Sequence, residues 1–211
     1  MLDKYRTITQ NAQAEFVEKK SRFIAYVRKV STEEEARAFI DEIKKKHWDA
    51  THNVFAYQVG EKGEIQRFSD DGEPQGTAGM PVLNVLKGGD IRNTAIVVTR
   101  YFGGILLGTG GLVRAYGKAA SLGIEAAGIS EMVLMHEYEI TADYSLFGKI
   151  EYYIQTEGFM IKGIEYTDKV TAKVLMEPEF ESGFMKKMSE LSSGQDIVKM
   201  IGEERVARRV K

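Results

Sequence analysis

The sequence predicts an α+β protein with two domains, an N-terminal α/β domain at residues 1–130 and a C-terminal ferredoxin-like domain at residues 131–211. Two observations lead to this fold class. Thirteen of the 21 glycines fall between Gly60 and Gly117, so the backbone of one region differs from the rest. Beyond that region the apolar pattern follows the order βαββαβ, which is the order of the ferredoxin-like fold. This change in pattern places a domain boundary near Ser130.

The composition is that of a soluble globular protein, with 43% hydrophobic and 28% charged residues among 211. The absence of cysteine excludes disulfides, thiolate nucleophiles and Cys-ligated zinc or iron–sulfur sites. The N-terminal segment has no apolar core of signal-peptide length, and no run approaches the ~20 apolar residues of a membrane helix. We therefore expect a cytoplasmic protein. A net charge of −2 argues against nucleic-acid binding over the whole surface, but it is compatible with a local basic groove.

The N-terminal domain is expected to begin with two short strands, Phe16–Lys19 and Arg22–Arg28, joined by a turn at Lys19, Lys20 and Ser21. A helix follows, because Ser31 and Glu34 have the spacing of a capping box. Its buried face is formed by apolar residues at helical spacing: Ala36, Phe39, Ile40 and Ile43.

A hairpin is predicted next, with strands Val54–Val59 and Ile65–Phe68, and then a short helix at Met80–Leu86. The run Ala95–Thr99 is β-branched and continuously apolar, as expected of a strand buried on both faces. The helix predicted at Leu112–Ala127 has many alanines and glycines on one side, which would let it lie close against a sheet.

In the C-terminal domain the expected strands and helices alternate in the order given above. The basic end, Arg205–Lys211, is expected to be a solvated terminus. The elements before it are Val133–Ala142, Leu146–Thr156, Met160–Tyr166, Val170–Met176, Glu179–Leu191 and Asp196–Ile201.

A candidate anion site lies where the predicted strand ends at Arg100 and a glycine-rich loop leads into the next helix. An open helix N-terminus favours anions, and Arg114 and Lys118 share one face of that helix. The spacing matches neither the Walker A motif nor the dinucleotide fingerprint. An alternative is that the glycines serve packing and both basic residues are merely solvated. The glycines of this loop are Gly103, Gly104, Gly108, Gly110 and Gly111.

Three carboxylates stand within four residues, at Asp70, Asp71 and Glu73, and Thr77 follows. Such a turn could hold Mg²⁺, accept hydrogen bonds from a guanidinium such as that of Arg100, or cap the next helix. The capping interpretation competes strongly, because Asp-Asp-Gly is an ordinary turn sequence.

The histidines are His47, His52 and His136, and none forms a close metal-ligand pair. A histidine-rich zinc site is therefore not expected, and no metal-binding residue is assigned. His52 opens the strand beside the glycine-rich region and could carry a proton or bind an anion, although a lone histidine is more often structural.

Three segments, ATHNVFAY (Ala50–Tyr57), FSDDGEPQGTAGMP (Phe68–Pro81) and TRYFGGILLGTGGLVRAYGKA (Thr99–Ala119), resemble the signature blocks of the IMPACT family. The resemblance covers the first ~130 residues. It implies a bacterial two-domain member whose domains resemble domains four and five of elongation factor G. The family motifs fall on His52, Asp70, Asp71, Glu73, Thr77, Arg100, Tyr101 and the loop glycines.

The resemblance implies no settled catalytic activity and no cofactor. Its eukaryotic namesake restrains amino-acid-starvation signalling to translation initiation by binding a ribosome-associated activator. We therefore expect a cytosolic, translation-associated factor that binds RNA, the ribosome or a translation-regulating protein, and no membrane. The alternative is a phosphate-handling small-molecule enzyme that uses the glycine-rich loop and the Asp70–Glu73 turn. A peptidase is the weakest interpretation, because the chain lacks cysteine, a metal-binding histidine motif and GxSxG.

Overall fold

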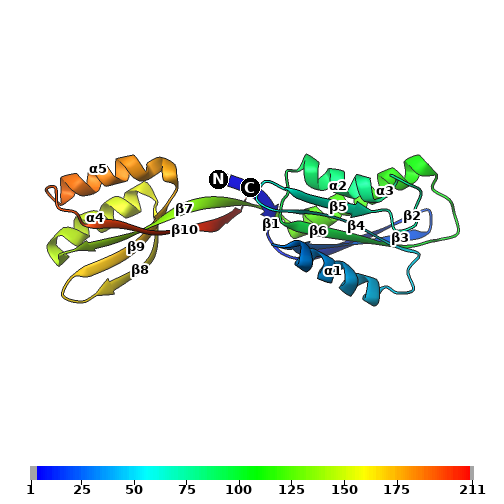
Figure 1. The fold of residues 1–211 in the computed structure, drawn as a ribbon, viewed down its shortest axis with the longest axis horizontal. Coiled ribbons are helices and arrows are strands. Elements are labelled where there is room, and N and C mark those ends of the chain that lie inside the picture. Colours follow the sequence, from blue (N-terminus) through cyan, green and yellow to red (C-terminus); the bar gives the residue numbers. More distant parts are fainter. Residues whose placement is uncertain (1–3, 210–211) are drawn as a thin grey trace. The chain divides into compact units, whose positions relative to one another are not determined.

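The computed structural model describes residues 4–209 and forms two compact units (Figure 1). The first unit comprises the chain up to Met132 together with the residues from Ala207 onward, and the second comprises Val133–Val206. Helices and strands occur in both, so the predicted α+β class and two-domain organisation are confirmed. Within residues 4–209, no helix is long and apolar enough to cross a membrane.

The first unit is built on a five-stranded sheet in the order β2-β3-β6-β4-β5. All its neighbouring strands are antiparallel. The central strand β6 is buried along nearly its whole length, as its continuous apolar run predicts. Strand β1 precedes this sheet and was not predicted. The strands of this unit are β1 (Lys4–Ile8), β2 (Ala12–Glu18), β3 (Ser21–Lys29), β4 (His52–Val59), β5 (Ile65–Ser69) and β6 (Thr94–Tyr101).

Helices cover both faces of this sheet, with α1 (Glu33–Lys46) on one face and α2 (Gly79–Gly88) and α3 (Thr109–Ala127) on the other (Figure 1). Because successive side chains of a strand point to opposite faces, each central strand contributes to both cores. In β6, for example, Ile96 packs with α2 and α3, whereas Val97 packs with α1. This alternation decides which polar residues can meet at the ends of the strands.

The predicted cap of α1 is displaced by one residue. Thr32 is the N-cap, and its hydroxyl accepts a hydrogen bond from the backbone N–H of Glu35. The Glu35 carboxylate accepts in turn from the N–H of Ser31. Ser31 and Glu34 also have capping-box spacing, and sequence spacing alone does not distinguish these two overlapping pairs.

The second unit has the predicted order βαββαβ, and its strands pair in the order β10-β7-β9-β8, as in the ferredoxin-like fold. Strand β1 also pairs with β7. Residues up to Arg209 belong to β10, so most of the expected solvated terminus is a paired strand; residues 210–211 lie outside the described part. The elements are β7 (Ile129–Ala142), α4 (Tyr144–Glu157), β8 (Met160–Tyr166), β9 (Val170–Met176), a 3-10 turn (Pro178–Phe180), α5 (Glu181–Leu191) and β10 (Val198–Arg209).

Candidate functional site

Two polar residues meet at the end of the central strands of the first unit. In the antiparallel register His52 of β4 lies directly opposite Arg100 of β6. Both have the parity of the core residues Val54 and Val98, so their side chains lie on the face covered by α2 and α3. Residues from two distant sequence blocks are thereby brought into contact distance.

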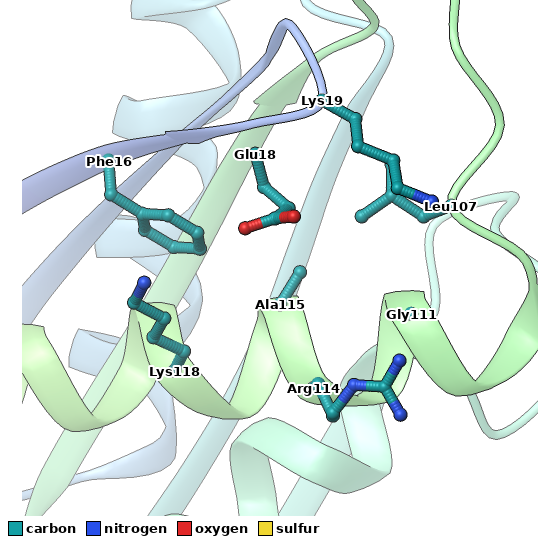
Figure 2. A pocket seen from close by; sticks show the side chains of 8 residues that line it. All are labelled: Phe16, Glu18, Lys19, Leu107, Gly111, Arg114, Ala115 and Lys118. Atoms are coloured by element: carbon teal, nitrogen blue, oxygen red, sulfur yellow. The ribbon is translucent and has the colours of Figure 1, made fainter.

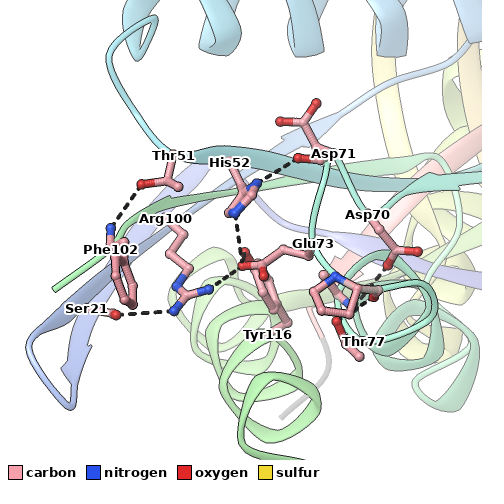
Figure 3. A network of polar contacts seen from close by, with 12 residues as sticks. Ser21, Thr51, His52, Asp70, Asp71, Glu73, Thr77, Arg100, Phe102 and Tyr116 are labelled. Carbon is pink, nitrogen blue, oxygen red and sulfur yellow. Dashed lines mark hydrogen bonds and ion pairs between the residues drawn. The ribbon is translucent and has the colours of Figure 1, made fainter. Parts of the chain in front are cut away.

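Glu73 joins these residues in a buried network (Figure 3). Its Oε1 accepts hydrogen bonds from Arg100 Nη1 at 2.5 Å and from the Tyr116 hydroxyl at 2.7 Å, and it lies 3.7 Å from His52 Nε2. Arg100 is only 4% exposed, and Tyr116 and Glu73 are also buried. A charge this deeply buried is tolerated only when it is paired, so Arg100 and Glu73 depend on each other.

The hydrogen bonds of His52 determine which of its ring nitrogens carries the proton. Nδ1 lies 2.8 Å from the backbone carbonyl oxygen of Asp71, and a carbonyl only accepts, so Nδ1–H is the donor. In the neutral ring Nε2 is then unprotonated and faces the Glu73 carboxylate. His52 can therefore accept a proton or a hydrogen bond at Nε2.

Tyr116 and Arg100 complete the electrostatics of the network. Burial, together with the adjacent Glu73 carboxylate, raises the pKa of the Tyr116 hydroxyl far above its ordinary value, so this group remains a donor. The second terminal nitrogen of Arg100 contacts the Ser21 hydroxyl at 3.4 Å. Its buried Nε has no hydrogen-bond partner among residues 4–209. Arg100 thus retains unused donor capacity.

A cavity of about 390 Å³ opens beside this network. Its walls are mostly apolar, and three members of the network, His52, Glu73 and Arg100, contribute its ionisable side chains. We call it the ion-pair cavity. The other lining residues are Thr51, Pro74, Phe102, Leu106, Leu107, Gly108, Thr109 and Leu112.

The remaining polar residues of the acidic turn have structural partners. Both oxygens of the Asp70 carboxylate accept backbone N–H groups, from Gly76, from the N-cap residue Ala78 and from Gly79, the first residue of α2. The Thr77 hydroxyl donates to the carbonyl of Pro74. The capping interpretation therefore fits Asp70.

Asp71 is likewise engaged. Its carboxylate accepts from the N–H of Asn53 at 2.6 Å and pairs with Lys44 at 3.0 Å. The three carboxylates of the turn thus face different partners, and the described residues contain no group of side chains arranged to hold a metal ion.

Tyr101 lies apart from the other predicted residues, because it follows Arg100 on the strand and so faces α1. Its hydroxyl donates to Asp49 and accepts from His47 Nδ1, while His47 Nε2 accepts from Tyr26. This chain of bonds requires a neutral His47, and burial together with Lys46 lowers the pKa of that histidine. Tyr101 and His47 therefore form a separate network on the opposite face.

The predicted basic residues Arg114 and Lys118 are exposed on α3 and line a second cavity of about 250 Å³. Figure 2 shows Glu18 and Lys19, from the β2–β3 hairpin, facing them across this cavity. The ammonium of Lys118 lies 4.6 Å from the centre of the Phe16 ring, a cation–π contact. We call the surface formed by Lys19, Arg114 and Lys118 the basic surface.

Glycines hold the loop in place between these two cavities. A Cβ on Gly103 would lie 2.1 Å from the carbonyl oxygen of Lys20, so only glycine lets the loop approach the hairpin tip this closely. Gly108 is the N-cap of α3 with φ +73°, a conformation that favours glycine. It supplies no side-chain cap, and Gly110 and Gly111 occupy the open first turn. Gly104 also has positive φ, at +82°.

Three contributors to the site were not predicted: Tyr116, Phe102 and the hairpin residue Lys19. The sequence does contain an indication that Tyr116 is buried. Tyr116 stands on the same helical face as Ala119, Ala120 and Gly123, which the pattern marks as buried, and a buried tyrosine hydroxyl needs a partner.

Comparison with known proteins agrees with this architecture. The model of the Impact N-terminal domain matches residues 19–124. IMPACT family member YvyE from Bacillus subtilis (strain 168) is 47% identical over 199 residues, covering 94% of this chain and 92% of the relative. The chain belongs to the IMPACT family. The resemblance of the three sequence segments is thereby confirmed.

Other members of the family differ in how much of this chain they match. A second family model, a domain of unknown function (DUF1949), matches residues 140–195. IMPACT family member YigZ from Escherichia coli (strain K12) is 36% identical over 179 residues, and the alignment covers 83% of this chain and 87% of that protein. The protein IMPACT homolog of Dictyostelium discoideum is 42% identical over 95 residues, or 43% of this chain and 27% of that protein. The likeness to this Dictyostelium protein is therefore confined to less than half of the chain.

A solved structure described as the crystal structure of a hypothetical protein has the same fold, with a TM-score of 0.60. It is 30% identical in sequence, and the alignment covers 96% of this chain and 99% of that one.

Proposed function

We propose that this IMPACT family protein is a cytosolic, translation-associated factor that binds RNA, free or in the ribosome, through the basic surface at the start of α3. The family resemblance supports the link to translation. The physical support is one observation: three cations surround a cavity beside an uncapped helix N-terminus. This is the arrangement that binds phosphate groups.

The charge balance of the basic surface favours an anion. Lys19, Arg114 and Lys118 face one carboxylate, that of Glu18, across the cavity. All three cations are exposed, so this excess of positive charge is accessible to a ligand. The whole protein carries a net charge of −2, and we therefore expect modest affinity that weakens as salt is added.

The hairpin that presents Lys19 has a turn that holds both its lysines in the left-handed region. Lys19 and Lys20 form its two-residue turn, and both have positive φ, at +44° and +65°. Lysine in this conformation costs roughly 1–2 kcal/mol per residue relative to the ordinary region. Such strain is found where a surrounding structure or a function requires it, and here the turn packs against Gly103.

The proposal is tested with the double variant Arg114→Ala/Lys118→Ala and a short single-stranded RNA, by fluorescence anisotropy over a range of salt concentrations. We expect weaker binding at low salt and a slope of log affinity against log salt that is flatter by about 1 to 1.5, because two phosphate contacts are lost. Both residues are exposed, so the unfolding free energy should change by less than about 1 kcal/mol.

The matched control is Lys149→Ala/Lys186→Ala, which removes two exposed charges from the second unit. It should leave RNA affinity close to that of the parent. Unchanged affinity of the Arg114→Ala/Lys118→Ala variant at every salt concentration would contradict the proposal.

The alternative, a small-molecule enzyme that uses Mg²⁺ on the acidic turn, has less support. Asp70 is occupied by backbone N–H groups, Asp71 by Lys44 and Asn53, and Glu73 by Arg100 and Tyr116. A metal ion at this turn would compete with these partners, and the described residues contain no group of side chains arranged to hold one.

A further inference from the structure

The start of α3 separates the two cavities of the first unit. Gly108 and Thr109 line the ion-pair cavity, whereas Gly111 and Arg114 line the cavity of the basic surface. Leu107 lines both. A ligand that follows the basic surface therefore passes the mouth of the ion-pair cavity within one helical turn.

We infer that the ion-pair cavity holds one unstacked base of a single-stranded RNA whose phosphates lie on the basic surface. The inference rests on the proposed function and names the form of RNA that the protein selects. The cavity volume, about 390 Å³, lies within the range of small-molecule sites, which is about 300–1,000 Å³.

The walls of the cavity suit the faces of a base. Phe102 is 45% exposed and Leu106 is 81% exposed, so large apolar side chains stand in water at the mouth. Every base has a flat face that can stack on an aromatic ring, so stacking contributes to the affinity for RNA of any base sequence. The Arg100 guanidinium lies 5.4 Å from the centre of the Phe102 ring and supports it from the protein side.

The floor of the cavity suits the polar edge of a base, which carries both donors and acceptors. His52 Nε2 is an acceptor in the neutral ring, because Nδ1–H is held by the Asp71 carbonyl. Arg100 has five N–H donors and contacts only Glu73 and Ser21 among the described hydrogen-bond acceptors.

Duplex RNA does not fit this arrangement. Its bases are stacked and paired inside the helix, whereas those of single strands can be splayed out onto aromatic side chains. The basic surface would contact the phosphates of either form, but only a single strand could also fill the ion-pair cavity. Selection of single strands thus depends on Phe102, and general affinity on Arg114 and Lys118.

The test measures the affinity of the full chain for four probes by fluorescence competition: a single-stranded RNA, the same strand without bases, a duplex of equal length, and AMP. For Phe102→Ala we expect about tenfold weaker binding of the single strand and no change for the duplex or the base-free strand. AMP should bind the parent far more weakly than the single strand, because it offers one phosphate in place of several.

Two further variants test the cavity a second time and control for the loss of an exposed phenylalanine. Leu106→Ala, at a side chain almost fully in water, cannot disturb the core and should reduce single-strand affinity a few-fold. Phe180→Ala removes an equally exposed phenylalanine, 46% exposed, from the second unit and should have no effect on RNA.

The outcomes separate the base pocket from the proposed function. If Phe102→Ala binds the single strand as the parent does, while Arg114→Ala/Lys118→Ala binds it less, the base pocket is wrong and the proposed function stands. Equal losses for single strand and duplex, or equal affinity of AMP and the single strand, would also overturn the base pocket. If the parent binds none of the RNAs at low salt, both are wrong.

Discussion

Glu73 is the residue on which the buried charges of the first unit depend. One of its oxygens accepts from Arg100 and from Tyr116 and lies closest to His52. The sequence identifies Glu73 only as one of three carboxylates in a turn. Of the other two, Asp70 accepts backbone N–H groups, and Asp71 accepts from the backbone N–H of Asn53 and pairs with Lys44. Which carboxylate points inward is decided by the turn geometry, where Asp71 and Gly72 both have positive φ.

We predict that Glu73→Gln destabilises the protein by about 3–5 kcal/mol, because it leaves the Arg100 charge buried without a counter-charge. Urea unfolding gives this value. Glu18→Gln is the matched control at an exposed glutamate and should change the unfolding free energy by less than about 0.5 kcal/mol.

The double variant Glu73→Gln/Arg100→Met provides a second measurement on the same pair. Its loss should be smaller than the sum of the two single losses by about 0.5–3 kcal/mol, since the charge is removed with its partner. Additive losses would mean that the two side chains do not stabilise each other.

The three helices of the first unit show what sequence patterns predict well and where they fail. The apolar spacing predicts all three, and the alanines and glycines of α3 correctly indicate close packing on a sheet. The pattern misses the first turn of α3, Thr109–Gly111, because two glycines and a threonine do not favour a helix. It also misses β1, a strand of only five residues in which Tyr5 and Ile8 are the apolar side chains.

Two glycines of α3 allow a matched prediction. A Cβ on Gly123 would lie 2.7 Å from Val27 Cγ2 and 3.1 Å from Ala25 Cβ, both on strand β3. Gly117, in the same helix, has no neighbouring atom within 4 Å of such a Cβ. We therefore expect Gly123→Ala to destabilise by about 1–3 kcal/mol and Gly117→Ala to stabilise by about 0.5–1 kcal/mol.

Urea unfolding of the two variants measures this difference directly. The same chemical change at two positions of one helix separates close packing from helix propensity. If Gly123→Ala is as stable as Gly117→Ala, the helix does not need the close approach that the sequence pattern indicates.

The whole molecule contains separate hydrophobic cores. Leu86 and Ile96 belong to the core under α2 and α3, whereas Phe184 and Ile150 belong to the core of the second unit. The sequence predicts the order βαββαβ of the elements that enclose the second core. The location of the site is harder to predict. His52 and Arg100 meet through the register of two strands that are distant in sequence, and Glu73 reaches them from the turn between β5 and α2.

Strands β7 and β10 contribute residues to both units, so the expected boundary near Ser130 falls within a strand. We nevertheless propose that each unit unfolds on its own, because the buried residues of the two largest cores belong to different units. Phe184→Ala should then destabilise the second unit by about 3–5 kcal/mol and leave the first nearly unchanged.

Native-state hydrogen exchange resolves this residue by residue. In Phe184→Ala the amides of β8 and β9 should exchange faster, while those of β3 and β6 keep the protection of the parent. Leu86→Ala is the reciprocal variant and should speed exchange in β3 and β6 only. If either variant accelerates exchange in both sets of strands by the same factor, the chain unfolds as one cooperative body. Stability would then be shared through β7 and β10, and a destabilising substitution in the second unit would also destabilise the first.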